Sequence, residues 1–264
     1  MENKDTAGAS GSLVGLLAEE AHPCLECARA RHNGATHLGP NAAVPQTHGA
    51  ATKPSATGKE TPLVMRFDLD RNARYGLAFS GGADSAYLLA ALLRDGYDVK
   101  AYTIRTAFQL PRDTEDALRL ARELNADHEL IDVDIFARDE VCANPADRCY
   151  LCKRVVFGTI LEHMAADGRA VLLDATNASD DPARRPGFRA MRELGVVSPL
   201  REAGMTKDDV RTASRELGLF TADKPSFACF AVRVPTSERI TPETLAVARR
   251  SFATDHPELG LVEE

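Results

Sequence analysis

The sequence predicts an α/β fold with a doubly wound parallel sheet. From residue 74 onward, short apolar runs rich in β-branched and aromatic residues alternate with stretches whose apolar residues recur at helical spacing. A turn with two adjacent glycines joins the first of these apolar runs to the first helical stretch. Ligands of such sheets bind at the carboxyl ends of the strands, so we expect the functional residues in the loops that follow strands.

The first half of the predicted sheet follows from this alternation. Residues 75–79 are expected to form a buried strand, residues 83–94 a helix and residues 99–104 a second strand. Pro111 opens the next helix, because proline is favoured at the first helical position. Residues 128–133 form the third predicted strand.

The second half continues the pattern. We expect a helix over residues 146–166, a fourth strand over 170–175, a helix over 187–194 and a fifth strand over 196–200. Thr206 and Asp209 have the spacing of a capping box, which predicts a helix that starts after Thr206 and ends at Gly218.

The opening segment differs in composition from the rest of the chain. The first 66 residues contain no aromatic residue and no isoleucine, so they cannot bury enough apolar surface to offset the entropy of ordering. We expect a disordered extension over residues 1–65, a nucleotide-binding domain over 66–235 and a short helical segment over 236–264. The extension contains the spacing of a small zinc knuckle, although we expect it to be unstructured; the residues are Cys24, Cys27, His32 and His37.

Charge and cysteine content limit the class of protein. A formal net charge of -7 argues against broad binding of nucleic acid through its phosphates. The sequence shows no export signal and no apolar stretch of the ~18 residues that a membrane span needs. We therefore expect a cytoplasmic protein without a membrane partner, in which the six cysteines serve metal or redox chemistry.

The glycine turn is the first candidate site. It reads Ser80-Gly-Gly-Ala-Asp-Ser85, where Gly81 and Gly82 let the backbone approach a ligand and the helix start points free N–H groups at it. An oligophosphate suits such a site. The simpler alternative is a capped strand-to-helix turn in which Asp84 and Ser85 only favour the first helical turn.

The string S-G-G-x-D-S resembles the pyrophosphate-binding loop (PP-loop) of the ATP pyrophosphatase superfamily. This resemblance implies that loop amides and hydroxyls hold the pyrophosphate of ATP and that Asp84 helps to place Mg²⁺, with a catalytic role. The implied nucleotide-binding residues are Ser80, Gly81, Gly82, Asp84, Ser85, Thr103, Asp174, Thr176 and Asn177.

Three cysteines form the second candidate site. Cys149 and Cys152 begin a predicted helix beside basic residues, a setting that favours thiolate, and Cys229 lies between Lys224 and Arg233. A redox disulfide for the CxxC pair and a small buried side chain for Cys229 are the alternatives.

From about residue 65 to residue 241 the chain resembles the LarE-type ATP-dependent sulfur transferases. The shared motifs are S-G-G-x-D-S, RCYLCK, DATNASDD, RRPGFRAMRELGVVSPL and KPSFACFAVR. The resemblance implies an adenine nucleotide alpha-hydrolase-like fold. It also implies an enzyme that adenylylates a carboxylate of pyridinium biscarboxylic acid mononucleotide, releases pyrophosphate and replaces AMP with sulfur, in the synthesis of the nickel-pincer nucleotide cofactor.

The resemblance leaves two sulfur sources open. Some members sacrifice the sulfur of one cysteine, which corresponds to Cys229, whereas three-cysteine members hold a 4Fe-4S cluster that takes a sulfide from a donor. Cys149, Cys152 and Cys229 fit the second type as metal ligands. Zinc is an alternative metal, and Cys142 is a possible fourth ligand that would close the open iron.

The resemblance also implies substrate contacts for Lys224 and Arg233, and a homo-oligomer. Ala175 and Val232 depart from the glycine and serine usual in the family, and we expect the 31 residues that follow Arg233 to be too few for the family's usual C-terminal domain. A tRNA thiolase with a PP-loop and a non-catalytic adenine-nucleotide-binding protein are the competing predictions.

Overall fold

The computed structural model describes residues 67–181 and 186–261. All of the described residues belong to one compact unit. The predictions for the N-terminal extension, including the possible zinc ligands Cys24, Cys27, His32 and His37, therefore lie outside the described residues.

A parallel four-stranded sheet forms the centre of the described part, with strand order β3-β2-β1-β4. The strands are β1 (Arg74–Ala78), β2 (Asp98–Arg105), β3 (Asp127–Asp132) and β4 (Val171–Leu173). Leu77 of β1 is in register with Ala101 of β2 and Leu173 of β4. Because every pair is parallel, the carboxyl ends of all four strands lie at one edge.

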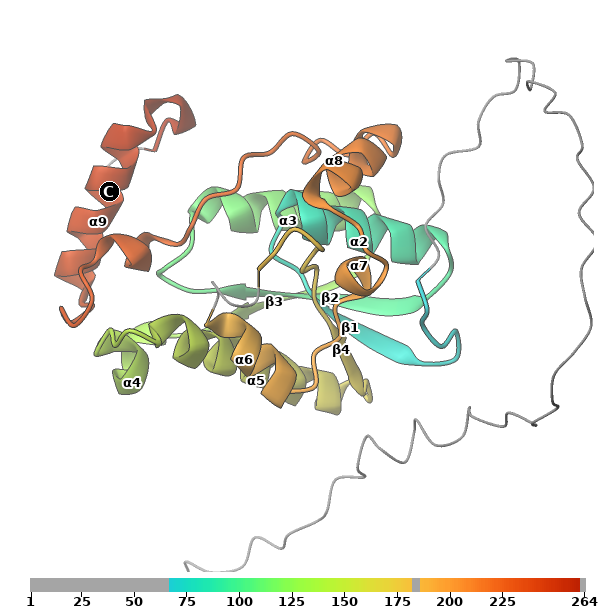
Figure 1. Cartoon of the computed structure of the whole chain (residues 1–264), viewed down its shortest axis with the longest axis horizontal. Coiled ribbons are helices and arrows are strands. Elements are labelled where there is room, and N and C mark those ends of the chain that lie inside the picture. Colours follow the sequence, from blue (N-terminus) through green and yellow to red (C-terminus); the bar gives the residue numbers. More distant parts are fainter. Residues whose placement is uncertain (1–66, 182–185, 262–264) are drawn as a thin grey trace, which may run out of the picture. The chain divides into compact units, whose positions relative to one another are not determined.

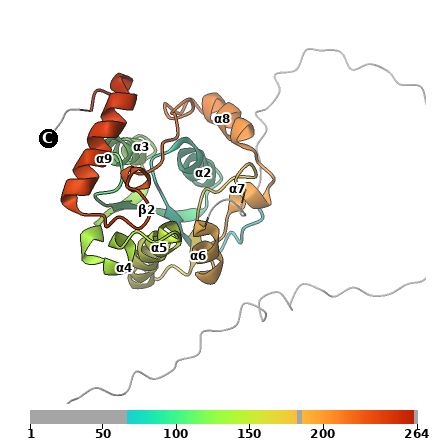
Figure 2. The same cartoon turned by 60° about the vertical axis from the view of Figure 1, so that its left-hand side comes forward.

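Helices cover both faces of this sheet, which confirms the predicted α/β, doubly wound class. Figures 1 and 2 show α2, α3 and α8 on one face and α5 and α6 on the other. The α-helices are α2 (Ala83–Arg94), α3 (Pro111–Glu123), α4 (Asp139–Cys142), α5 (Arg148–Ala166), α6 (Gly187–Glu193), α7 (Pro199–Glu202), α8 (Lys207–Glu216) and α9 (Pro242–Asp255). Short 3-10 turns are η1 (Ile135–Ala137), η3 (Phe230–Arg233) and η4 (Pro257–Leu259).

The predicted fifth strand over residues 196–200 is wrong. Val197 forms only an isolated bridge with Leu173, and α7 starts at Pro199. Proline has no N–H to continue a ladder, and the Ser198 hydroxyl donates to Asp174 Oδ1 at 2.6 Å. The chain therefore leaves the sheet after one paired residue.

The predicted capping box before α8 and the glycine after it are confirmed. The capping box before α8 is present, with Asp209 N–H donating to Thr206 Oγ1 and Thr206 N–H donating to the Asp209 carboxylate at 2.9 Å. Gly218 follows that helix with a φ of +67°. Within the described ranges, no helix is both long and apolar enough to cross a membrane.

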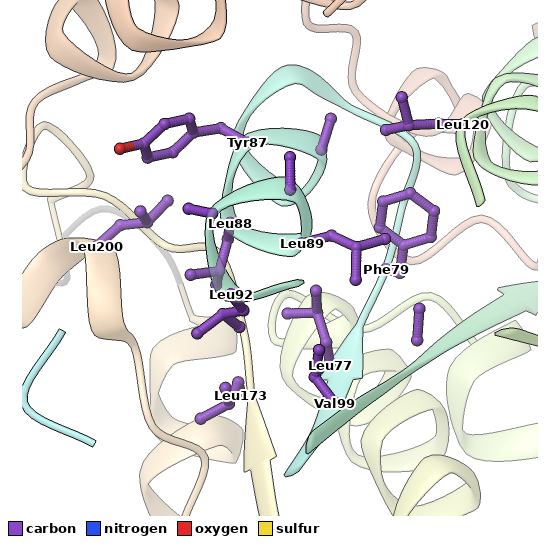
Figure 3. Packing of buried hydrophobic residues seen from close by; sticks show 14 of the residues in the cluster. Leu77, Phe79, Tyr87, Leu88, Leu89, Leu92, Val99, Leu120, Leu173 and Leu200 are labelled. Atoms are coloured by element: carbon purple, nitrogen blue, oxygen red, sulfur yellow. The ribbon is translucent and has the colours of Figure 1, made fainter. Parts of the chain in front are cut away.

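The main apolar core lies between the sheet and α2. Figure 3 shows Leu88, Leu89 and Leu92 of α2 packed toward Leu77 and Leu173 of the sheet. A second cluster fills the space under α5 on the opposite face. A third cluster joins α9 to the loops beyond the strand ends; its members include Phe108, Ile135, Phe230, Leu245 and Phe252.

Candidate functional site

The PP-loop leaves β1 in a conformation that requires its first glycine. Gly81 has a φ of +71°, and a Cβ there would lie 2.4 Å from the backbone oxygen of Asp113 in α3. Ser80 Oγ accepts from the N–H of Gly82 at 3.4 Å and lies 3.2 Å from Ser85 Oγ. No side chain caps α2 at Gly82, so the N–H groups of its first turn are left for a ligand.

Asp84 connects this loop to the one that follows β4. Asn177 Nδ2 donates to Asp84 Oδ1 at 3.0 Å, and Asn177 Oδ1 accepts from the N–H of Ser179 at 2.9 Å. Burial raises the pKa of the Asp84 carboxyl, while the Asn177 hydrogen bond and the charge of Lys207 act in the opposite direction. The hydrogen bond from Asn177 thus orients the Asp84 carboxylate toward the loop that follows β4. A residue that only favoured the first turn of α2 would not need this contact.

Asp174 and Thr176 shape the end of β4. The two carboxylate oxygens of Asp174 accept from the hydroxyls of Ser198 and Thr176, and Asp174 and Thr176 are buried. Ser198 was missed by the sequence reasoning, because it lay inside the predicted fifth strand. These two hydroxyls hold the Asp174 carboxylate in one orientation at the end of β4.

Thr103 stabilises the chain directly before the PP-loop. It is 3% exposed, donates to the carbonyl oxygen of Phe79 at 2.7 Å and lies 2.9 Å from His128 Nε2. Burial lowers the pKa of His128, which favours the neutral imidazole at this position. Thr103 and His128 therefore hold Phe79, which follows β1 and directly precedes Ser80.

The structure brings the three predicted cysteines together. Cys149 and Cys152 lie in the first turns of α5, and Cys229 directly precedes η3. Burial, together with the charges of Cys229 and Cys149, raises the pKa of Cys152 to about 12. Burial also raises the pKa of Cys229, against the opposing charge of Arg148. The predicted thiolate-favouring setting is therefore wrong for Cys152, because burial outweighs the basic neighbours.

Arg148 and Asn144 hold the two cysteine segments against each other. The buried Arg148 guanidinium donates to Asn144 Oδ1 at 3.1 Å and to the carbonyl oxygen of Ala231, and approaches Cys149 Sγ at 3.6 Å. Asn144 Nδ2 in turn donates to three carbonyl oxygens of the segment that follows η3. Sequence reasoning noted the charge of Arg148 but missed Asn144.

Cys142 does not join this group. Its side chain is 1% exposed, and its thiol donates to the carbonyl oxygen of Ile135 at 3.3 Å. Across the described residues, no three or more His, Cys, Asp or Glu side chains are arranged to hold a metal ion. Cys149, Cys152 and Cys229, the predicted metal ligands, are therefore not found as a ready metal-binding group in the described part of the chain.

Lys224 and Arg233 have partners in different parts of the fold, and each forms at least one ion pair with a carboxylate. Lys224 Nζ lies 2.9 Å from Asp113 Oδ1 and 2.6 Å from Asp116 Oδ2. Arg233 Nη1 lies 2.6 Å from Asp255 Oδ2 of α9. Sequence reasoning missed all three carboxylates, since nothing in their local sequence marks them as partners.

Comparison with known proteins identifies the family. Pyridinium-3,5-bisthiocarboxylic acid mononucleotide synthase of Lactiplantibacillus plantarum is 31% identical over 195 residues, which cover 72% of this chain and 69% of that protein. The chain belongs to this LarE-type family of sulfur transferases. No protein-family model matches it.

The chain is also similar to several other proteins. An uncharacterised Synechocystis protein is 37% identical over 64% of this chain, but the chain spans only 63% of that protein. A tRNA-specific 2-thiouridylase MnmA of Thermotoga is 27% identical over 57% of this chain and 54% of that enzyme. Among solved structures, the NMN synthetase of Francisella tularensis has a TM-score of 0.47 at 17% identity, covering 72% of this chain and 87% of that one.

Proposed function

We propose that this protein uses ATP to activate a carboxylate of a pyridinium mononucleotide and then transfers sulfur to the activated carbon. The observation that supports this most is the convergence of three thiols in a chain that also has a PP-loop with Asp84 aimed across it. The synthase named above is related over most of the described part of this chain.

In the activation step, the loop amides and the hydroxyls of Ser80 and Ser85 bind the β- and γ-phosphates of ATP with Mg²⁺. Asp84 and Asp174 are the carboxylates that would hold the metal ion, which neutralises the phosphate charge that opposes attack. The substrate carboxylate attacks the α-phosphorus, the bond to the bridging oxygen breaks, and pyrophosphate leaves. Asn177 orients Asp84 through its amide.

In the transfer step, a sulfur nucleophile attacks the acyl carbon and AMP leaves. Cys149, Cys152 and Cys229 have the donor chemistry for a 4Fe-4S cluster, whose cysteines bind different irons. These three residues would hold such a cluster, and its chemistry would be the delivery of a sulfide taken from an external donor. Arg148 contributes a buried positive charge beside the thiols. Sacrifice of the Cys229 sulfur is the alternative source.

The test is pyrophosphate release from ATP by the purified protein with the pyridinium biscarboxylate mononucleotide as acceptor. We expect release to depend on this acceptor and the product to contain sulfur. Absence of pyrophosphate with this acceptor, in a protein that binds ATP, would refute the proposal.

A second candidate is thiolation of tRNA, which the similarity to MnmA favours. It predicts that unmodified tRNA stimulates pyrophosphate release and that the pyridinium nucleotide does not. A cytoplasmic location and a homo-oligomeric assembly remain predictions of the sequence.

A further inference from the structure

Lys224 has a buried ammonium whose partners come from two other segments of the chain. The side chain is 8% exposed, and Nζ contacts Asp113 Oδ1 at 2.9 Å and Asp116 Oδ2 at 2.6 Å. Its third contact is the carbonyl oxygen of Gly81 in the PP-loop, at 3.1 Å. These three contacts use the three N–H donors of the ammonium group.

The contact with Gly81 determines which way the loop amides point. The peptide between Gly81 and Gly82 is planar and trans, so its carbonyl oxygen and its N–H point in opposite directions. Since the oxygen is held toward Lys224, the N–H of Gly82 is turned away from Lys224 and toward Ser80 Oγ. That is the side on which the predicted phosphate-binding groups gather.

The local charge argues against Lys224 as a substrate ligand. Two carboxylates face one ammonium, and Asp116 is itself mostly buried. A substrate phosphate that bound Lys224 would have to separate these ion pairs, which would leave Asp113 without this cation and Asp116 with only the exposed Arg112 beside it.

We propose that Lys224, with Asp113 and Asp116, is a positioning residue that orients the PP-loop amides for ATP and does not bind the acceptor substrate. This inference rests on the proposed use of ATP. It replaces the substrate contact that the family resemblance implies for Lys224, and it assigns a role to two carboxylates that sequence reasoning missed.

The test compares Lys224→Met and Asp116→Asn with the wild-type protein. Lys224→Met removes the charge and all three contacts, whereas Asp116→Asn weakens one contact and keeps the shape of the side chain. Arg112→Gln is the matched control, because Arg112 is an exposed cation 3.8 Å from the same Asp116 oxygen and, among the described residues, forms no hydrogen bond or ion pair with the loop. Circular dichroism and thermal unfolding check that each variant is folded.

Three values are measured for each folded variant: the dissociation constant of a non-hydrolysable ATP analogue, and the KM for ATP and the KM for the acceptor in pyrophosphate release. We expect both substitutions to weaken analogue binding and raise the KM for ATP, by about tenfold or more for Lys224→Met, because a charged hydrogen bond is lost. The KM for the acceptor should change by less than about twofold. Arg112→Gln should leave all three values unchanged.

The opposite pattern overturns the inference. If analogue binding is unchanged while the KM for the acceptor rises in Lys224→Met, the lysine is a substrate ligand. If neither analogue binding nor any KM changes in Lys224→Met and Asp116→Asn, Lys224 does not orient the PP-loop amides. If Lys224→Met does not fold, Asp116→Asn decides, and unchanged analogue binding in it refutes the role. Failure of the wild-type protein to bind the analogue would refute the proposed function itself.

Discussion

Replacing Asn144 with alanine should destabilise the protein and loosen the cysteine site. Asn144 is 2% exposed, its amide donates to the carbonyl oxygens of Val234, Pro235 and Glu238, and its side-chain oxygen accepts from Arg148. Its φ of +53° lies in the left-handed region, which asparagine tolerates better than alanine.

The expected loss of unfolding free energy is about 2–4 kcal/mol, of which about 1–3 comes from buried groups left without partners and the rest from the backbone. Urea unfolding measures it. Asn125→Ala is the matched control, because Asn125 has a φ of +50° but is exposed, so this substitution should cost only the backbone part. The reasoning is refuted if the two substitutions destabilise equally. Asn144→Ala should also speed alkylation of Cys229, whose segment loses its anchor.

Three further predictions concern the two sites. Asp84→Ala should abolish pyrophosphate release by a folded protein, because it removes the carboxylate that places Mg²⁺; wild-type turnover would contradict the loop assignment. Asn177→Ala should shift the acid limb of the pH–rate profile to higher pH, because the Asn177 hydrogen bond lowers the pKa of Asp84 and its loss leaves burial to raise that pKa further; an unshifted or opposite limb would argue against this. If the three thiols hold one cluster, its colour and sulfur transfer should both be lost in Cys149→Ala, Cys152→Ala and Cys229→Ala, whereas Cys142→Ala should keep both. If only Cys229→Ala loses transfer, and the intact-protein mass falls after one turnover, the sulfur comes from Cys229.

The sequence was sufficient where the signals are local. The residues of α2 and the capping box of Thr206 were predicted correctly because spacing along the chain determines them. The strand over residues 196–200 failed because a hydrogen bond from Ser198 to a distant aspartate, and the proline after it, end the pairing.

The candidate site was predictable in its residue types but not in its electrostatics. Burial, which no local pattern encodes, reversed the expectation for the thiol of Cys152 and also raises the pKa of Cys229. The partners of Lys224 are more than 100 positions away in the sequence, so only the folded chain shows that its charge is already neutralised.

The contact between Lys224 and the PP-loop also limits how far apart the two chemical steps can be. Cys229 follows Lys224 by five residues, and a fully extended segment of that length spans at most about 18 Å. In the proposed reaction, an acyl adenylate formed at the loop would be open to attack by water until sulfur reaches it. The five-residue connection between Lys224 and Cys229 would then keep this intermediate and the thiols close to each other.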